Sequence, residues 1–144
     1  MKGEQRPTLQ EEVIYRPQDH LQLFDQLKVD SIVPRISDEV ACAPFRKFGL
    51  YVYLDSTSTP DVIHIEVEFL DEWSGQWYTH KQGPFAALFW EDTDTASGIY
   101  EVFTGDVNGR AMRVKITGVN VAASGNVFSS TKYFTSSIAV DFWN

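Results

Sequence analysis

The sequence contains little of the chemistry that most enzymes and metalloproteins need. Cys42 is the only cysteine among 144 residues, which excludes an intrachain disulfide framework and every metal motif built from several cysteines. The three histidines, His20, His64 and His80, are too scattered for a metal-ligand spacing, and none lies beside a recognisable nucleophile motif. We therefore expect a protein that is not an enzyme and that binds no cofactor.

Long hydrophobic runs are also missing. No stretch approaches the length of a transmembrane helix, so we expect no membrane partner. The N-terminal residues MKGEQRPTLQEE lack the apolar segment of a secretory signal. This absence predicts synthesis in the cytoplasm.

Positive charge is scarce in the larger, C-terminal part of the chain. The formal net charge is −8, and residues 49–144 hold five Lys and Arg against twelve Asp and Glu, whereas residues 1–48 are nearly balanced. An acidic surface repels phosphate backbones, so the sequence disfavours nucleic-acid binding. With 43% hydrophobic and 14% aromatic residues, the chain is too apolar to be disordered and has the length of one globular domain plus a tail.

Strand patterns are clearest in residues 62–79. In this stretch a second set of residues, Val62, His64, Glu66 and Glu68, alternates with four apolar residues. The apolar residues are Ile63, Ile65, Val67 and Phe69. This alternation predicts a strand with one buried face. The turn residues that follow include Gly75, which tolerates positive φ, and a short β-prone stretch then returns to complete a hairpin.

Further strand-like runs occupy residues 48–54, 85–90, 99–104, 110–117, 127–134 and 137–143. The run 85–90 could instead form a short buried turn of helix, although the two aromatic residues at its end favour a strand. In the run 110–117, Arg113 and Lys115 point outward, and we expect them to lie across from Glu66 and Glu68. Seven or eight short strands at this spacing predict an all-β fold, an antiparallel β-sandwich over residues 45–144.

Residues 1–44 are predicted to form an extended N-terminal arm or linker, because their first 36 residues lack sustained periodicity and contain Pro7, Pro17 and Pro34. A short helix over 19–28 is the one regular element that the pattern allows. The arm either packs on its own domain or contacts a neighbouring subunit. In the second interpretation the partner-binding residues are its apolar clusters, Val13, Ile14, Tyr15, Leu21, Leu23, Phe24, Leu27 and Ile32.

Two ligand-binding interpretations remain open at this stage. Trp73, Trp77 and Tyr78 could stack on sugars, since aromatic rings bind the apolar faces of pyranoses, or they could serve packing and subunit contacts. The acidic loop 91–98 is not an EF-hand, because it lacks the turn glycine and the bidentate Glu. A looser Ca²⁺ site between loops is compatible with it.

Three segments together resemble those of a known group of proteins. They are IHIEVEFLDEWSGQWYTH (63–80), GRAMRVKITG (109–118) and FTSSIAVDFWN (134–144). An alternating strand with a polar turn and Gln-Trp-Tyr, an Arg-Val strand and a Phe-rich closing strand resemble the capsid decoration, or cement, proteins of tailed bacteriophages. The resemblance covers about residues 48–144.

The resemblance implies a jelly-roll-like sandwich without enzymatic activity. It implies a homotrimer that binds the lattice of the major capsid protein on the capsid surface and stabilises the head, with the arm gripping neighbours. A tail or baseplate accessory protein with a similar sandwich is the alternative, as is the carbohydrate-binding module above. The expected location is the virion.

Overall fold

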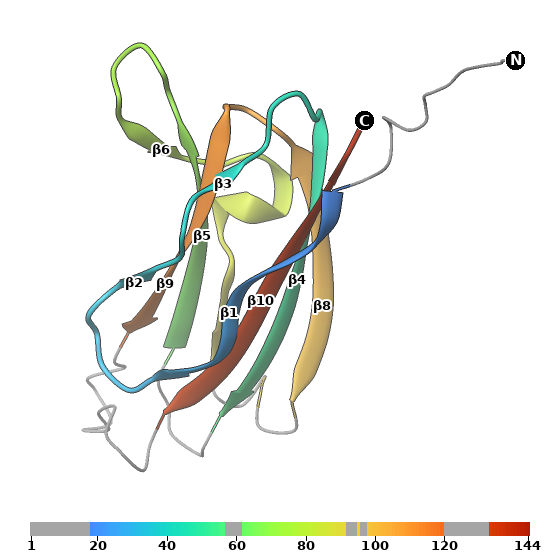
Figure 1. Cartoon of the computed structure of the whole chain (residues 1–144). Coiled ribbons are helices and arrows are strands. Elements are labelled where there is room, and N and C mark those ends of the chain that lie inside the picture. The colour runs from blue at the N-terminus through green and yellow to red at the C-terminus, as the bar shows by residue number, and fades with distance from the viewer. Residues whose placement is uncertain (1–17, 57–61, 92–94, 96–97, 120–132) are drawn as a thin grey trace, which may run out of the picture.

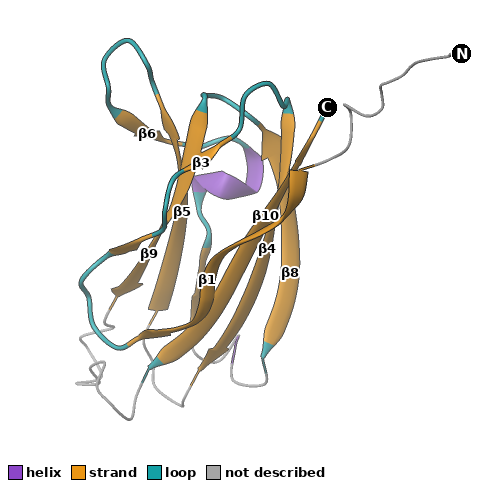
Figure 2. Ribbon diagram, in the orientation of Figure 1, coloured by secondary structure: helices purple, strands orange, loops and turns teal. Residues whose placement is uncertain are grey.

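The computed structural model describes residues 18–56, 62–91, 95, 98–119 and 133–144, whose strands form two antiparallel sheets packed face to face (Figure 2). This arrangement confirms the all-β sandwich. Sheet A has four strands, in the order β1 (Gln18–Val29), β10 (Phe134–Trp143), β4 (Lys47–Ser56) and β8 (Ile99–Asp106).

Sheet B is built around β9 (Ala111–Val119) and β5 (Val62–Leu70), which pair with each other. The free edge of β9 pairs with two short strands, β2 (Arg35–Ile36) and β3 (Val40–Ala41). The free edge of β5 pairs with β6 (Trp77–Thr79) and β7 (Phe89–Glu91). A 3₁₀ turn, η1 (Gly83–Ala86), connects β6 to β7.

The strand order is that of a jelly roll. If β2 with β3, and β6 with β7, are each counted as one interrupted strand, the sheets have eight strand positions. The first position pairs with the eighth, the second with the seventh, the third with the sixth and the fourth with the fifth. A long antiparallel ribbon wound around itself gives this pattern, with successive pairs lying alternately in sheet A and sheet B.

The core lies between the two sheets and follows the alternation in the sequence. One face of β5 is buried between the sheets, as the hairpin prediction requires, and it carries Ile63, Ile65, Val67 and Phe69. The side chains on the opposite face of β5 pair with neighbouring strands or contact solvent. Sheet A contributes a matching row from its two central strands. These buried side chains are Phe48, Leu50, Val52, Leu54, Phe134, Ile138, Val140 and Phe142.

The helix expected over residues 19–28 is wrong, because this stretch is the edge strand β1. Its pairing with β10 shifts register at three places, and Gln26, at the last of them, has a positive φ of 54°. Each bulge adds a residue between inward positions, which gives Phe24 and Leu27 the three-residue spacing of a helix. Leu21, Leu23, Phe24 and Leu27 are half-buried against the sandwich's own core.

The boundary expected between residues 44 and 45 is therefore wrong for residues 18–41, which supply β1, β2 and β3 of the two sheets. Residues 1–17 lie outside the described residues. The run 85–90 is strand only at its end, because Pro84 at the start of η1 has no N–H for a ladder and β7 begins at Phe89. Most of the strand expected over 127–134 also lies outside the described residues.

The β5–β6 and β8–β9 turns lie at the same end of the sandwich. Residues 71–76 between β5 and β6 project there, next to the turn 107–110 between β8 and β9, and β10 ends on the same side (Figure 1). A Cβ on Gly109 would lie 2.8 Å from the carbonyl oxygen of Leu70, so the two turns are in close contact. This end is called the hairpin end below.

Candidate functional site

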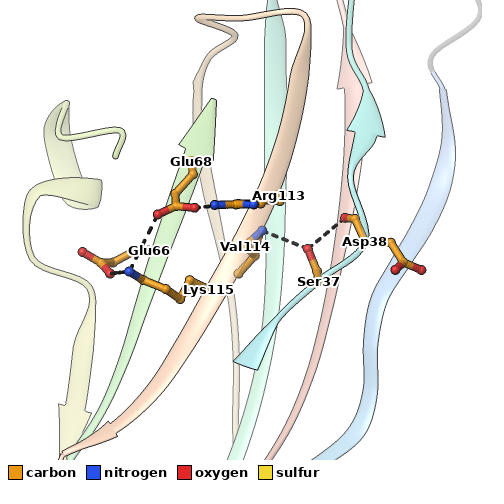
Figure 3. Close-up of polar contacts among 7 residues, drawn as sticks. All are labelled: Ser37, Asp38, Glu66, Glu68, Arg113, Val114 and Lys115. Atoms are coloured by element: carbon orange, nitrogen blue, oxygen red, sulfur yellow. Dashed lines mark hydrogen bonds and ion pairs between the residues drawn. The ribbon is translucent and has the colours of Figure 1, made fainter. Parts of the chain in front are cut away.

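The outer face of sheet B holds a network of paired charges (Figure 3). Arg113 Nε donates to Glu68 Oε1 at 2.7 Å, and Lys115 Nζ lies 3.4 Å from Glu66 Oε1 and 3.8 Å from Glu68 Oε2. These are the cross-strand pairs expected from the sequence. Glu68 is only 6% exposed, however, so it is an enclosed ion-pair partner and not a solvated surface residue.

The same network extends to both sides of β9. The guanidinium of Arg113 lies 4.2 Å from the centre of the Trp77 ring, a cation–π contact. On the other side, Ser37 fills the gap between β2 and β3: the Val114 N–H donates to Ser37 Oγ, which itself donates to the Asp38 carbonyl (Figure 3). The side chains of Glu66, Glu68, Arg113 and Lys115 are thus paired within the chain.

The outer face of sheet A holds several aromatic and small residues together with the ion pair His20–Asp141. Tyr53 of β4 and Tyr100 of β8 lie directly opposite each other, with ring centroids 4.9 Å apart. They border a shallow trough of about 350 Å³, here called the tyrosine trough. Its lining residues are His20, Gln22, Tyr51, Val52, Tyr53, Tyr100, Glu101, Val102, Ser137 and Ala139.

The side chains at the β8 side of the trough are exposed although they are aromatic or apolar. Tyr100 is 83% and Val102 53% exposed. On the opposite side, the Tyr51 ring packs edge-on against His20, whose Nδ1 lies 2.8 Å from Asp141 Oδ1. Burial, together with the hydrogen bond and charge of Asp141, raises the pKa of Tyr51, so this phenol remains neutral.

The β5–β6 turn displays the most exposed large apolar side chain among the described residues, Trp73, which is 96% exposed. The turn itself is ordered, because the Asp71 carboxylate accepts hydrogen bonds from the N–H groups of Trp73 and Ser74 and from Ser74 Oγ. The hydrogen bond from Ser74 Oγ and those from the two N–H groups lower the pKa of Asp71. Gly75 adopts φ +70°, as the sequence predicts.

An ion pair fixes the base of this turn to the neighbouring one. Arg110 Nε lies 2.6 Å from Glu72 Oε2, across the contact between the turns 71–76 and 107–110. The indole of Trp73 is therefore held out in solvent by a braced turn. The residues 71–76 are called the hairpin tip below.

His80 is a packed core residue. It is 7% exposed, and its ring lies 4.9 Å from Phe85, 5.4 Å from Phe69 and 5.8 Å from Phe48, between ring centroids. Its Nε2 has no hydrogen-bond partner. Burial lowers the pKa of His80, against an opposing effect of Asp106, which favours the neutral ring that such an apolar site accepts.

The structure separates the residues of the sugar-stacking interpretation. Trp77 and Tyr78 are consecutive strand residues and point to opposite sides of sheet B: Trp77 packs on Arg113, and Tyr78 lines a hollow beside His80. Trp73 projects from the turn by itself. The three rings do not form one flat platform.

The residues expected to bind a partner also fall into separate groups. Leu21, Leu23, Phe24 and Leu27 pack on their own core. Ile32, between β1 and β2, is exposed. Val13, Ile14 and Tyr15 lie outside the described residues, so their contact with a neighbour stays a prediction.

The described residues contain no group of three or more His, Cys, Asp or Glu side chains placed to hold a metal ion. Most of the loop 91–98, which was considered for Ca²⁺, lies outside them. Cys42 is buried, and burial raises the pKa of its thiol to about 11, as suits a packed residue. Within the same described part of the chain, no helix has the length and apolarity needed to cross a membrane.

The fold and its surfaces define a jelly-roll β-sandwich with one charge-paired outer face and one aromatic outer face. No protein-family model matches the sequence, and no curated protein sequence is detectably similar to it. Comparison with solved structures does find the fold.

One similar structure is that of infectious bursal disease virus, Gx strain: its TM-score is 0.63 at 12% identity, over 88% of this chain and 32% of that one. The crystal structure of the infectious bursal disease virus VP2 subviral particle gives a TM-score of 0.53 at 9% identity, over 89% and 33%. At sequence identities this low, the structural similarity shows a shared fold and nothing more specific. The chain spans about a third of the length of these two chains.

Proposed function

We propose that this chain is a non-enzymatic structural protein of a virus particle, and more specifically a decoration protein of a bacteriophage capsid. The observation that carries the first part is the jelly-roll order of the strands, shared with two chains from structures of a virus and of a subviral particle. The second part is supported by the resemblance of segments 63–80, 109–118 and 134–144 to cement proteins. Its partners are the major capsid protein lattice and further copies of itself, as a homotrimer.

A decoration protein stabilises a shell because it binds only the assembled lattice and so shifts the equilibrium towards the intact state. The test uses particles of the phage that encodes this chain, prepared without the protein. Purified chain is mixed with these particles, and the mixture is sedimented through a gradient. We expect the chain to move with the particles in a fixed ratio to the major capsid protein and to raise the temperature at which they open. A chain that stays at the top of the gradient and leaves this temperature unchanged contradicts the proposal.

The N-terminal residues are the proposed grip on neighbouring subunits. Deleting residues 1–17 removes Val13, Ile14 and Tyr15 but leaves β1 complete. We expect the truncated sandwich to keep its sheet circular dichroism and to bind particles at least about tenfold more weakly. Unchanged particle binding would place the contact on the sandwich itself.

Carbohydrate binding is the second candidate, and the exposed indole of Trp73 is the observation that favours it. A glycan array with the native chain and Trp73→Ala separates it from the structural role. A reproducible signal that disappears in Trp73→Ala would support sugar binding.

A further inference from the structure

We propose that the hairpin tip of one copy of this chain docks in the tyrosine trough of a second copy, with Trp73 as the inserted side chain. This inference rests on the self-association included in the proposed function and names the two surfaces that make it. Every residue that makes up these two surfaces is described by the structure, and no described residue fills the trough or covers Trp73.

The two surfaces are compatible in chemistry, because both present aromatic rings. Trp73 is 96% exposed on a turn that the Asp71 hydrogen bonds and the Arg110–Glu72 ion pair hold in place, so little conformational entropy is lost when it binds. The trough is an open hollow of about 350 Å³ bordered by tyrosine rings, on which an indole can stack. Exposed tryptophan and tyrosine are the residues that most often dominate protein interfaces.

The charges at these two surfaces are partly balanced within the chain. The chain carries a net charge of −8, so two copies repel each other wherever unpaired carboxylates meet. Near the tip, Glu72 is paired with Arg110. In the trough, Glu101 accepts a hydrogen bond from Trp90 Nε1, and Asp141 lies 2.8 Å from His20 Nδ1. Glu72 and Asp141 thus each lie beside a basic side chain, whereas the hydrogen-bond donors to Asp71 and Glu101 are neutral groups.

The hairpin tip of a chain cannot reach the trough of the same chain. The tip lies at the hairpin end, beyond the position where β4 begins at Lys47 and β8 ends at Asp106. Tyr53 and Tyr100 lie six residues further along these strands, about 20 Å from that end at the rise of a strand, and they belong to sheet A, whereas the tip extends from sheet B. The indole and the trough can therefore meet only between copies.

A contact between two different surfaces is heterologous, and it closes into a ring when the rotation between neighbours permits. The proposed homotrimer is a ring of this type, in which every copy gives one tip and receives another. Each copy then uses both surfaces once.

The test uses two variants that each remove one surface. Trp73→Ala keeps the trough, and Val102→Asp keeps the tip while placing a charge on an exposed trough residue. Matched controls are Tyr78→Ala, which removes an exposed aromatic from the same hairpin, and Thr104→Asp, which adds the same charge on the same side of β8 outside the trough. All four residues are exposed, so folding is checked by circular dichroism and is expected to be unchanged.

Sedimentation velocity over a range of concentrations gives the readout. We expect the native chain and both controls to associate alike, and each of the two surface variants to associate at least about 30-fold more weakly. A mixture of Trp73→Ala and Val102→Asp should form a one-to-one complex and nothing larger, because only one intact tip and one intact trough remain per pair.

Three results would overturn the inference: a native chain that is monomeric at every concentration, a surface variant that associates like the native chain, or a mixture that forms no complex. Particle binding is measured separately by sedimentation with phage. A monomer that binds particles would refute this contact and leave the structural role standing. A chain that self-associates through these two surfaces but does not bind particles would support this contact and contradict the decoration role.

Discussion

The outer faces of sheet A and sheet B both meet solvent, but their side chains are satisfied in different ways. On sheet B, Glu68 lies between Arg113 and Lys115, and Arg113 also packs on Trp77. On sheet A, Tyr100 and Val102 remain exposed beside an unfilled trough. Charged groups that are paired within the chain gain little from a partner, whereas exposed aromatic groups gain by burial.

The edges of sheet A show the same division. β1 is blunted by three register shifts along β10, a common way to protect a strand edge from further pairing. β8 pairs with β4 over eight consecutive residues without a shift, and no described strand pairs with its other edge. The unprotected edge and the aromatic trough thus lie together on one side of the sandwich.

Substitution of Glu68 should have the largest effect on stability. Glu68→Lys places a third cation beside Arg113 and Lys115 in an enclosed site, so we expect the free energy of unfolding to fall by about 3 kcal/mol or more. Urea denaturation measures it. A loss within about 0.5 kcal/mol would show that the pair contributes nothing to the fold.

The paired replacement sharpens this result. Glu68→Gln with Arg113→Gln removes both charges while keeping groups that can hydrogen-bond, and we expect the double variant to recover most of the stability lost in Arg113→Gln alone. Arg113→Gln leaves the Glu68 carboxylate enclosed without its guanidinium partner. Additive losses in a double-mutant cycle would mean that the two side chains do not interact.

On sheet A the expected pattern is reversed. Tyr100→Lys also adds a cation, but to a side chain that is 83% exposed, so we expect the free energy of unfolding to change by no more than about 0.5 kcal/mol. Self-association should be lost, because a charge then borders the trough. Stability and association measured on the same sample separate the two faces. A strong loss of stability from Tyr100→Lys would contradict the comparison.

Acidification should affect the core between the faces through His80. Its pKa is lowered in the folded state, so its contribution to stability is complete above the unfolded pKa near 6.5 and is lost as the pH falls below that value towards the folded pKa. We expect part of the stability difference between pH 7 and pH 5 to disappear in His80→Phe, since a phenyl ring suits the surrounding Phe48, Phe69 and Phe85. An unchanged pH dependence would assign the effect to other groups.

The smallest effect is expected at the hairpin tip. The pKa of Asp71 is lowered by its hydrogen bonds, so the order they give the turn is present above pH 4 and is lost as the pH falls through the folded-state pKa. We expect the fluorescence anisotropy of Trp73, isolated as the difference between the native chain and Trp73→Phe, to decrease in Asp71→Asn at neutral pH. Equal anisotropy in the two proteins would show that the carboxylate does not brace the turn.

Residue patterns predicted most of the sandwich where one face of a strand is buried and the other polar. β5, β9 and β10 follow this rule, and the pairs of Glu66 and Glu68 with Lys115 and Arg113 could be placed from it. β1 could not, because its bulges break the two-residue period and mimic the spacing of a helix.

The two proposed contact surfaces were predictable to different degrees. Trp73 was named with Trp77 and Tyr78 as an aromatic residue for sugar stacking or subunit contacts, but the exposure that distinguishes it from them depends on how the turn projects. Tyr100 and Val102 were not identified, because the trough forms only when β8 pairs with β4, and 42 residues separate these two strands in the sequence. Strand order in a jelly roll is a long-range property that local alternation does not encode.

Hydrogen–deuterium exchange of the native chain at low and high protein concentration tests most directly whether the sheet A side is the contact surface. Amides of the hairpin tip and of β8 should exchange more slowly at high concentration, because a neighbouring copy covers them. Amides of β9 and of the paired part of β5 should exchange at the same rate in both samples. Protection confined to β5 and β9, or no protection anywhere, would contradict the account.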